Sequence, residues 1–187
     1  MKELALHVLD IAENSVRARA DRIKIEVLEN VGEDVLEIAV EDNGEGMDEA
    51  MMKRVRDPFF TGQSKKKKIG LGIPLLEQLA EHCDGKLDIS SQPRLGTKVR
   101  ACFRRSHIDL PPLGSMADTL IALFGSHPHI DIIYEHEVEE CRWSFSSRKL
   151  LEEIGLTTLG EMSQVLPGIR DWIEYHEQHL QEGAKNL

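Results

Sequence analysis

Two runs of alternating apolar residues near the N-terminus constrain the fold most strongly. The run "RIKIEVLEN" places Ile23, Ile25 and Val27 two residues apart, which is the period of a strand with one buried face. The run "DVLEIAVEDNG" over residues 34–44 predicts a second strand, and the short turn between the runs predicts a hairpin. The apolar face of such a hairpin needs a second layer to cover it.

Helical spacing in the flanking segments supplies that layer. Residues 4–18 predict a helix, and we expect its apolar stripe to consist of Leu6, Leu9, Ala12, Val16 and Ala20. A capping aspartate, Asp48, predicts a short helix over residues 49–55. The segments that follow predict a loop over 57–69 and a helix over 71–83. After them, "KLDISSQ" and "GTKVRACF" predict a pair of strands. The sequence therefore predicts an α+β fold, a two-layer α/β sandwich with helices on one face of a mostly antiparallel sheet.

The segment "SHIDLPPLGS" divides the chain. We predict one domain over residues 1–105, a linker over 106–115, and a C-terminal α/β extension over 116–187. Within the extension the pattern predicts a helix near 116–125, strands near 130–137 and 141–146, and a helix near 147–154. The capping-box spacing of Thr158 and Glu161 predicts a further helix, which Pro167-Gly168 should break before a last helix that runs to about Gln181.

Negative charge is concentrated in the second half of the chain, which limits the partners that can bind there. The chain of 187 residues has a formal net charge of -10, and residues 107–187 hold 5 Lys and Arg against 14 Asp and Glu. A segment this acidic argues against a nucleic-acid surface in that half of the chain. No uncharged apolar run reaches the roughly 18 residues of a membrane span, and the N-terminus does not read as a signal peptide. Three cysteines without C-x-x-C spacing indicate reduced thiols, so we expect a cytoplasmic protein.

Two motifs carry side chains suited to chemistry. In "VEDNGEGM" a strand delivers the carboxylate of Asp42 into a turn with Gly44 and Gly46, where a ligand can approach the backbone closely. The carboxylate can accept a hydrogen bond from an amino group such as that of adenine, although the same residues also suit a plain turn. In "LDIAENS", Asp10 and Asn14 share one helix face. That pair suits a hard metal and an activated water or hydroxyl, but taken alone it is more typical of a solvated helix face.

A third motif concentrates positive charge. In "SKKKKIGLGIPLL", four lysines precede Gly70 and Gly72 and then a helix, whose free N–H groups favour an anion. Nucleic acid, a membrane surface and a phosphorylated small molecule are the candidate partners for these lysines, and a simple solvated run is the alternative. A fourth motif, "LGTKV", is a glycine turn that enters a strand.

In this order and spacing, residues 4–105 resemble the GHKL superfamily, which includes sensor histidine kinases, gyrase-type topoisomerases, mismatch-repair ATPases and anti-sigma kinases. The segments "ENSVRARADRIKI", "DNGEGM", "RDPFFTG", "KIGLGIPLLEQLAEHCDGKLDISS" and "GTKV" resemble its N, G1, F, G2 and G3 boxes. The resemblance implies the Bergerat ATP-binding fold, with Asn14 as the Mg2+ ligand, Asp42 on adenine N6 and Thr97 near the adenine. It implies a catalytic role for Asp10, and further contacts with ATP from Gly44, Gly46, Met47, Phe59, Lys65, Lys68, Gly70, Leu71 and Gly72.

The chain departs from the family pattern at two of these positions. Lys68 stands where sensor kinases usually have the first glycine of the G2 box, and Asp10 stands where many ATPases of the group have glutamate. The lysine run is then expected to form part of a lid over the ATP phosphates.

Two functions follow from the resemblance. The first is an ATP-dependent, histidine-kinase-like phosphotransferase in a signalling system, with the phosphoacceptor supplied by a separate protein. The second is an ATP-dependent conformational switch, similar to anti-sigma or mismatch-repair proteins, with slow or no hydrolysis. The acceptor residue type, the oligomeric state and the role of the extension are left open by the sequence.

Overall fold

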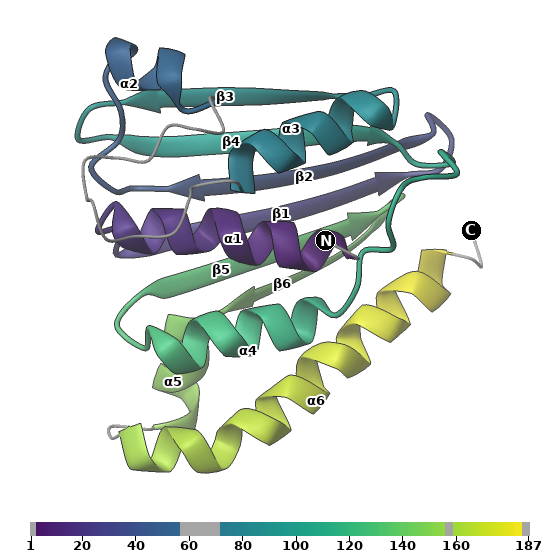
Figure 1. Cartoon of the computed structure of the whole chain (residues 1–187). Helices are drawn as coiled ribbons and strands as arrows, with labels where there is room; N and C mark the ends of the chain where they lie inside the picture. The colour runs from purple at the N-terminus through teal and green to yellow at the C-terminus, as the bar shows by residue number, and fades with distance from the viewer. Residues whose placement is uncertain (1–2, 57–71, 156–158, 185–187) are drawn as a thin grey trace.

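The computed structural model describes residues 3–56, 72–155 and 159–184, and arranges them as a sheet with a layer of helices (Figure 1). The strands are β1 (Arg22–Asn30), β2 (Val35–Asp42), β3 (Lys86–Gln92), β4 (Gly96–Arg104), β5 (Asp131–Val138) and β6 (Cys141–Ser146). The helices are α1 (Leu4–Arg17), α2 (Glu49–Arg54), α3 (Gly72–His82), α4 (Met116–Ser126), α5 (Ser147–Ile154) and α6 (Leu159–Ala184). The predicted α+β class and two-layer sandwich are confirmed.

All six strands belong to one sheet, in the order β3-β4-β2-β1-β5-β6. Every neighbouring pair is antiparallel except β1 and β5, which run parallel with Arg22 opposite Asp131. The strands of the C-terminal part therefore extend the sheet of the N-terminal part at the β1 edge. The division into a domain, a linker and an extension remains a prediction.

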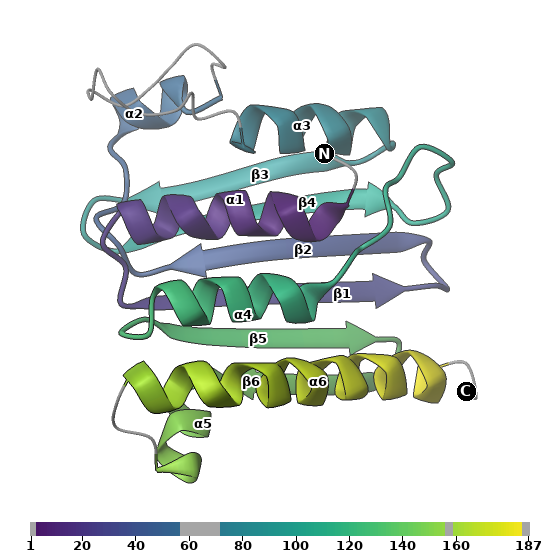
Figure 2. The same ribbon diagram turned by 60° about the horizontal axis from the view of Figure 1, so that its bottom comes forward.

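The helices α1, α3, α4 and α6 lie on one face of the sheet (Figure 2). Beneath them, alternate strand residues such as Ile25, Ile38 and Tyr134 are almost completely buried. On the other face the strands carry charged side chains that pair across the sheet, as between Lys98 and Glu41 at 3.1 Å. One apolar and one polar face is the pattern expected of a sheet that is covered on one side only.

The buried stripe of α1 differs from the predicted one. The structure buries one side of the helix, while Leu6 is 41% exposed. The buried residues are Leu4, Ala5, His7, Val8, Ile11, Ala12 and Ser15, so Ala12 is the predicted position that is confirmed within α1. Both stripes have helical spacing, but they are rotated relative to each other, and Leu9 and Val16 only flank the core. The start of α1 is held by the segment after β4, because the amides of Leu4 and Ala5 donate to the carbonyls of Pro112 and Leu113.

The predicted break at Pro167-Gly168 is wrong, because α6 continues through Pro167 as one helix of 26 residues. A proline inside a helix lacks the N–H that would bond the carbonyl four residues earlier, and its ring crowds that turn. The apolar stripe of α6 continues on the far side of the proline, with Ile169, Ile173 and Leu180 buried in the core. Tertiary packing along this stripe offsets the local cost of the proline.

A buried charged cluster attaches α6 to the sheet. The side chain of His136 on β5 is completely buried, and its Nδ1 lies 2.9 Å from Oε2 of Glu177 on α6. Its Nε2 lies 3.4 Å from Oε1 of Glu29 on β1, which also accepts hydrogen bonds from Arg105 and Gln181. Burial alone would lower the pKa of His136, but the two carboxylates outweigh it and raise the pKa to about 9. The neighbouring His136 is in turn the main reason why the pKa of Glu29 falls to about 2.

Replacing this histidine should give a pH-dependent loss of stability. A histidine whose pKa rises from 6.5 to about 9 on folding stabilises the protein fully below pH 6.5 and loses that contribution as the pH rises through 9. The difference in unfolding free energy between wild type and His136→Gln should therefore shrink by on the order of 3 kcal/mol across that window. Urea unfolding at several pH values measures it, with exposed His129→Gln as the control. A difference that does not change with pH would contradict the charged cluster.

Candidate functional site

Asp42 ends β2 on the helix-covered face of the sheet and is only 9% exposed. Its Oδ2 accepts a hydrogen bond of 2.7 Å from the hydroxyl of Ser15 on α1, and its Oδ1 accepts one of 2.9 Å from the amide of Gly44. These two donors fix the plane of the carboxylate and partly offset the cost of burying it. Each oxygen retains a lone pair, so the group can accept a further hydrogen bond from a ligand.

The loop after Asp42 packs so tightly that two of its positions admit only glycine. A Cβ on Gly44 would lie 2.6 Å from the carbonyl oxygen of Ala18 at the end of α1. Gly46 has a φ of +63°, and a Cβ there would lie 1.9 Å from the carbonyl oxygen of Gln92. The loop is therefore wedged between α1 and the β3–β4 turn, which keeps backbone close to the space beside Asp42.

Thr97 lies directly opposite Asp42 in the pairing of β2 with β4. Its hydroxyl lies 2.9 Å from that of Ser91 on β3, and the same Ser91 hydroxyl accepts a hydrogen bond of 2.8 Å from the amide of Met47. One serine thus joins the predicted G1 loop to the predicted G3 turn. Asp42, Met47 and Thr97, which the sequence predicts as ligands of one nucleotide, meet at one end of the sheet.

Asp10 and Asn14 lie one turn apart on α1, in the turns next to Ser15. A Cβ on Gly72 would lie 3.2 Å from the Cβ of Asp10, so the first turn of α3 packs closely against α1 at this point. The free amides at the start of α3 favour an anion, and Asp10 is itself negative, so a phosphate there would need a cation beside it. The carboxylate of Asp10 and the carboxamide of Asn14, whose oxygen now accepts from Arg17 at 3.0 Å, are the oxygen donors that Mg2+ prefers.

Five predicted site residues lie outside the described residues, namely Phe59, Lys65, Lys68, Gly70 and Leu71. Ser15 is the site residue that sequence reasoning missed. The signal that would have found it is the buried stripe of α1, because Ser15 follows Ile11 and Ala12 on that stripe and so faces the sheet. Within the described part of the chain, no group of three or more His, Cys, Asp or Glu side chains is placed to hold a metal.

The C-terminal part of the chain contacts this end of the sheet. The carboxamide oxygen of Asn43 accepts from the amides of Asp21 and Arg22, and the carbonyl of Asp21 accepts from the amide of Asp131 at 2.9 Å. His127, at the end of α4, lies 3.2 Å from Glu13, the neighbour of Asn14. The motif residues are thus linked to the start of β5 by the first series of polar contacts and to the end of α4 by the second.

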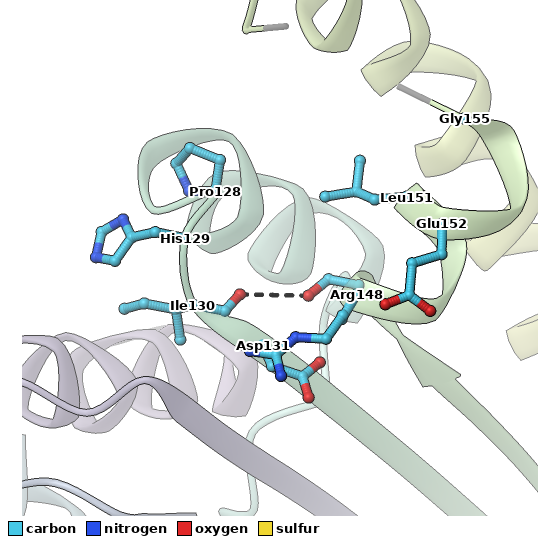
Figure 3. Close-up of a pocket in the computed structure, with 9 residues that line it drawn as sticks. Pro128, His129, Ile130, Asp131, Arg148, Leu151, Glu152 and Gly155 are labelled. Atoms are coloured by element: carbon cyan, nitrogen blue, oxygen red, sulfur yellow. Dashed lines mark hydrogen bonds between the residues drawn. The ribbon is translucent and has the colours of Figure 1, made fainter. Parts of the chain in front are cut away.

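A pocket of about 370 Å3 lies beside these contacts, between the α4–β5 turn and α5 (Figure 3). His129 and Asp131 line it from the turn, and Arg148 and Glu152 line it from α5. Ser147 also lines the pocket, and its hydroxyl donates to the carbonyl of Ile130 at 3.3 Å. None of the predicted nucleotide ligands that the structure describes lines this pocket.

The comparison with protein families agrees with this geometry. The family described as "Histidine kinase-, DNA gyrase B-, and HSP90-like ATPase" matches residues 2–107. The match covers more than half of the chain, so the chain belongs to this family of GHKL-type ATP-binding domains. This membership supports ATP binding and a kinase-like class of protein.

Similar curated proteins include several sensor kinases. The chain is 32% identical over 108 residues to the sensor histidine kinase YxdK of Bacillus subtilis strain 168, covering 54% of this chain and 33% of that protein. It is 36% identical over 90 residues to the sensor protein kinase FleS of Pseudomonas aeruginosa PAO1, covering 48% of this chain and 22% of that protein. The chain thus matches a third or less of the length of these relatives.

A solved structure described as the N-terminal domain of a DNA repair protein supports the fold. It has a TM-score of 0.53 and 16% sequence identity, and the match covers 78% of this chain and 52% of that one. At this identity the likeness concerns the fold alone. Among the described residues, no helix combines the length and the apolar character needed to cross a membrane.

Removing the Ser15 hydroxyl should weaken nucleotide binding without unfolding the protein. Ser15→Ala deletes one of the two donors that orient Asp42, at a cost of about 1 kcal/mol, or roughly a fivefold loss of ATP affinity. Isothermal titration calorimetry measures the change. Ser147→Ala is the matched control, since Ser147 is also a buried serine and its hydroxyl accepts from the amide of Ile132 at 2.8 Å, beside α5. Equal affinities of wild type and Ser15→Ala would show that Ser15 does not orient the carboxylate.

Proposed function

We propose that this chain binds ATP with Mg2+ and transfers the γ-phosphoryl group to a separate partner protein. The observation that supports the proposal most strongly is the meeting of four elements at one end of the sheet. The end of β2 supplies an oriented carboxylate, with the start of β4 directly beside it. The second half of α1 supplies two oxygen donors for a metal, and the start of α3 supplies a helix N-terminus for phosphate. The similarity to sensor kinases favours phosphotransfer over other uses of ATP.

In this proposal Asp42 reads the adenine. Its fixed, buried carboxylate accepts a hydrogen bond from the exocyclic amino group, while Thr97 lies across the β2–β4 pair from it. Gly44, Gly46 and Met47 form the wall beside the base, where a larger side chain at either glycine would collide with backbone. A buried acceptor matched to one donor gives selectivity, because a base with a carbonyl in that place leaves the carboxylate unpaired.

The phosphates would lie between α1 and the first turn of α3. Bound Mg2+ would neutralise the charge on the phosphate oxygens and hold them in position. Asn14 is proposed as its ligand and Asp10 as the group that orients the attacking hydroxyl or imidazole. Lys65 and Lys68, with Phe59, Gly70 and Leu71, are proposed to complete the phosphate end as a lid, with Gly72 at the helix start. Catalysis in such a site consists mainly of positioning and charge neutralisation.

The acceptor is proposed to be a side chain of another protein. Two histidines of the C-terminal part precede a glutamate, His136 and His176. His136 is completely buried between Glu29 and Glu177, so it is inaccessible to a phosphoryl donor. His176 stacks on Trp143 with the ring centroids 5.2 Å apart. The three cysteines are free thiols, which agrees with the proposed cytoplasmic location.

A second candidate function is a conformational switch driven by ATP binding. The specific observation that favours it is the polar connection from Asn43 through Asp21 to Asp131, and from Glu13 to His127. A nucleotide that moves the loop after Asp42 or the end of α1 would act directly on the start of β5 and the end of α4.

Transfer of label from γ-labelled ATP distinguishes the two functions. Purified chain, added to a lysate of the source organism with Mg2+, should label a specific protein band. Asn14→Ala should abolish the labelling and weaken ATP binding in the presence of Mg2+, but change metal-free binding much less, because only the metal ligand is lost. Stability of the label in acid then separates a Ser or Thr acceptor from a His acceptor.

Gln178→Ala is the control for this variant, because it also removes a carboxamide from a helix, here an exposed one, and should label like wild type. Binding of ATP without any labelled protein, together with slower amide exchange in β5 and α4 when ATP is bound, would support the switch and rule out the kinase.

A further inference from the structure

The aromatic residues of the chain are few and unevenly placed. The sequence has 2 Trp, 2 Tyr and 5 Phe, and both tryptophans lie together where α6 packs over β6. Trp143 on β6 stacks on His176 of α6 at 5.2 Å between ring centroids, and Trp172 meets both rings edge to face. Tyr175 continues the row to His179 at 3.9 Å. We call these five residues the aromatic flank.

The exposed part of the aromatic flank is not needed to bury α6, although Trp143 itself packs against the core. The core side of the helix is formed by Ile169, Ile173 and Leu180, all of which are buried. Trp172 and Tyr175 lie on the adjoining side and are 41% and 53% exposed. Large exposed aromatic groups held in a fixed row are typical of protein interfaces, where they supply contact area at a low cost in side-chain entropy.

The charge around the aromatic flank is negative. Residues 171–184 contain Asp171, Glu174, Glu177 and Glu182 and no Lys or Arg. Just before them, Arg170 is shared by three carboxylates, those of Asp118, Asp171 and Glu174, at 2.6, 3.3 and 3.0 Å. One guanidinium cannot neutralise three carboxylates, so the surface beside Trp172 attracts cations and repels a second copy of itself.

β6 is an edge strand of the sheet. Among the described residues its hydrogen-bonded neighbour is β5 alone, and α6 lies over this edge (Figure 2). A strand edge with unpaired backbone groups can accept an extended segment of another chain.

We propose that the aromatic flank and the β6 edge form a docking surface for an extended, arginine-containing segment of a partner protein. Arginine fits this surface because its planar guanidinium stacks on Trp or Tyr while its N–H groups pair with carboxylates such as Asp171. The backbone of the segment extends the sheet beyond β6. This surface is separate from the nucleotide site and does not depend on the proposed phosphotransfer.

Tryptophan fluorescence tests the proposal directly, because both tryptophans lie in the aromatic flank. The probe is a synthetic octapeptide of alternating Arg and Val, compared with peptides in which Arg is replaced by Lys or by Glu. The Arg peptide should give a saturable change, the Lys peptide a weaker one and the Glu peptide none. The double variant Trp172→Ala/Tyr175→Ala, followed through Trp143 and by calorimetry, should lose at least about tenfold in affinity.

Two controls separate specific docking from general attraction to an acidic protein. The first control, Ile108→Ala, removes an exposed apolar side chain elsewhere on the protein. The second compares two pairs of substitutions that each remove two negative charges. These are Asp171→Asn/Glu174→Gln on α6 and Glu152→Gln/Glu153→Gln on α5. Only the α6 pair should weaken binding. Equal affinity in all variants, or a wild-type chain that self-associates through Trp172 in sedimentation and ignores the peptide, would overturn the proposal.

Discussion

The burial of a single carboxylate at the end of β2 organises the proposed site. Leu36, Ile38 and Val40 point toward the helices, and the two-residue period of the strand carries Asp42 to the same side. A buried carboxylate without partners would be very costly, so its environment must supply donors. Ser15 of α1 and the amide of Gly44 do so, and both depend on the close packing of the loop against Ala18. The tight loop, the hydroxyl on α1 and the open coordination of Asp42 are therefore parts of one arrangement.

Strand β1 connects the proposed site to the C-terminal part of the molecule. It pairs with β2 on one side and with β5 on the other, so that its first residues touch both Asn43 and Asp131. At its other end, Glu29 joins His136 and Gln181 in the charged cluster that holds α6. The acidic C-terminal part is thus attached to the ATP-binding part by a continuous strand ladder and by a buried ionic cluster. Such an attachment couples the two parts more closely than a flexible linker would.

Local pattern was enough to predict most elements of this fold. The hairpin of β1 and β2, the pair β3 and β4, and the capping of α2 by Asp48 all depend on neighbours in sequence, and the structure has them. Asp42, Asn14 and Thr97 could be selected because their motifs have a distinctive order.

What the sequence could not predict depends on contacts between distant segments. Two rotations of α1 satisfy the same helical period, and only the packing on the sheet selects the one that buries Leu4 and Ser15. The passage of α6 through Pro167 needs the core contacts of Ile169 and Ile173. The parallel pairing of β5 with β1 could not be predicted either. The alternation of apolar and polar residues indicates which face of a strand is buried, but not which strand it pairs with.

The selectivity of the site for the base tests the central claim most directly. If the carboxylate of Asp42 accepts a hydrogen bond from the adenine amino group, then guanine and hypoxanthine, which have a carbonyl in that place, leave it unpaired. Calorimetric titration of the wild-type chain with ATP, GTP and ITP should therefore give a preference for ATP of about ten- to a hundredfold, or roughly 1.5 to 3 kcal/mol. Equal affinity for the three nucleotides, or a preference for GTP, would contradict the account.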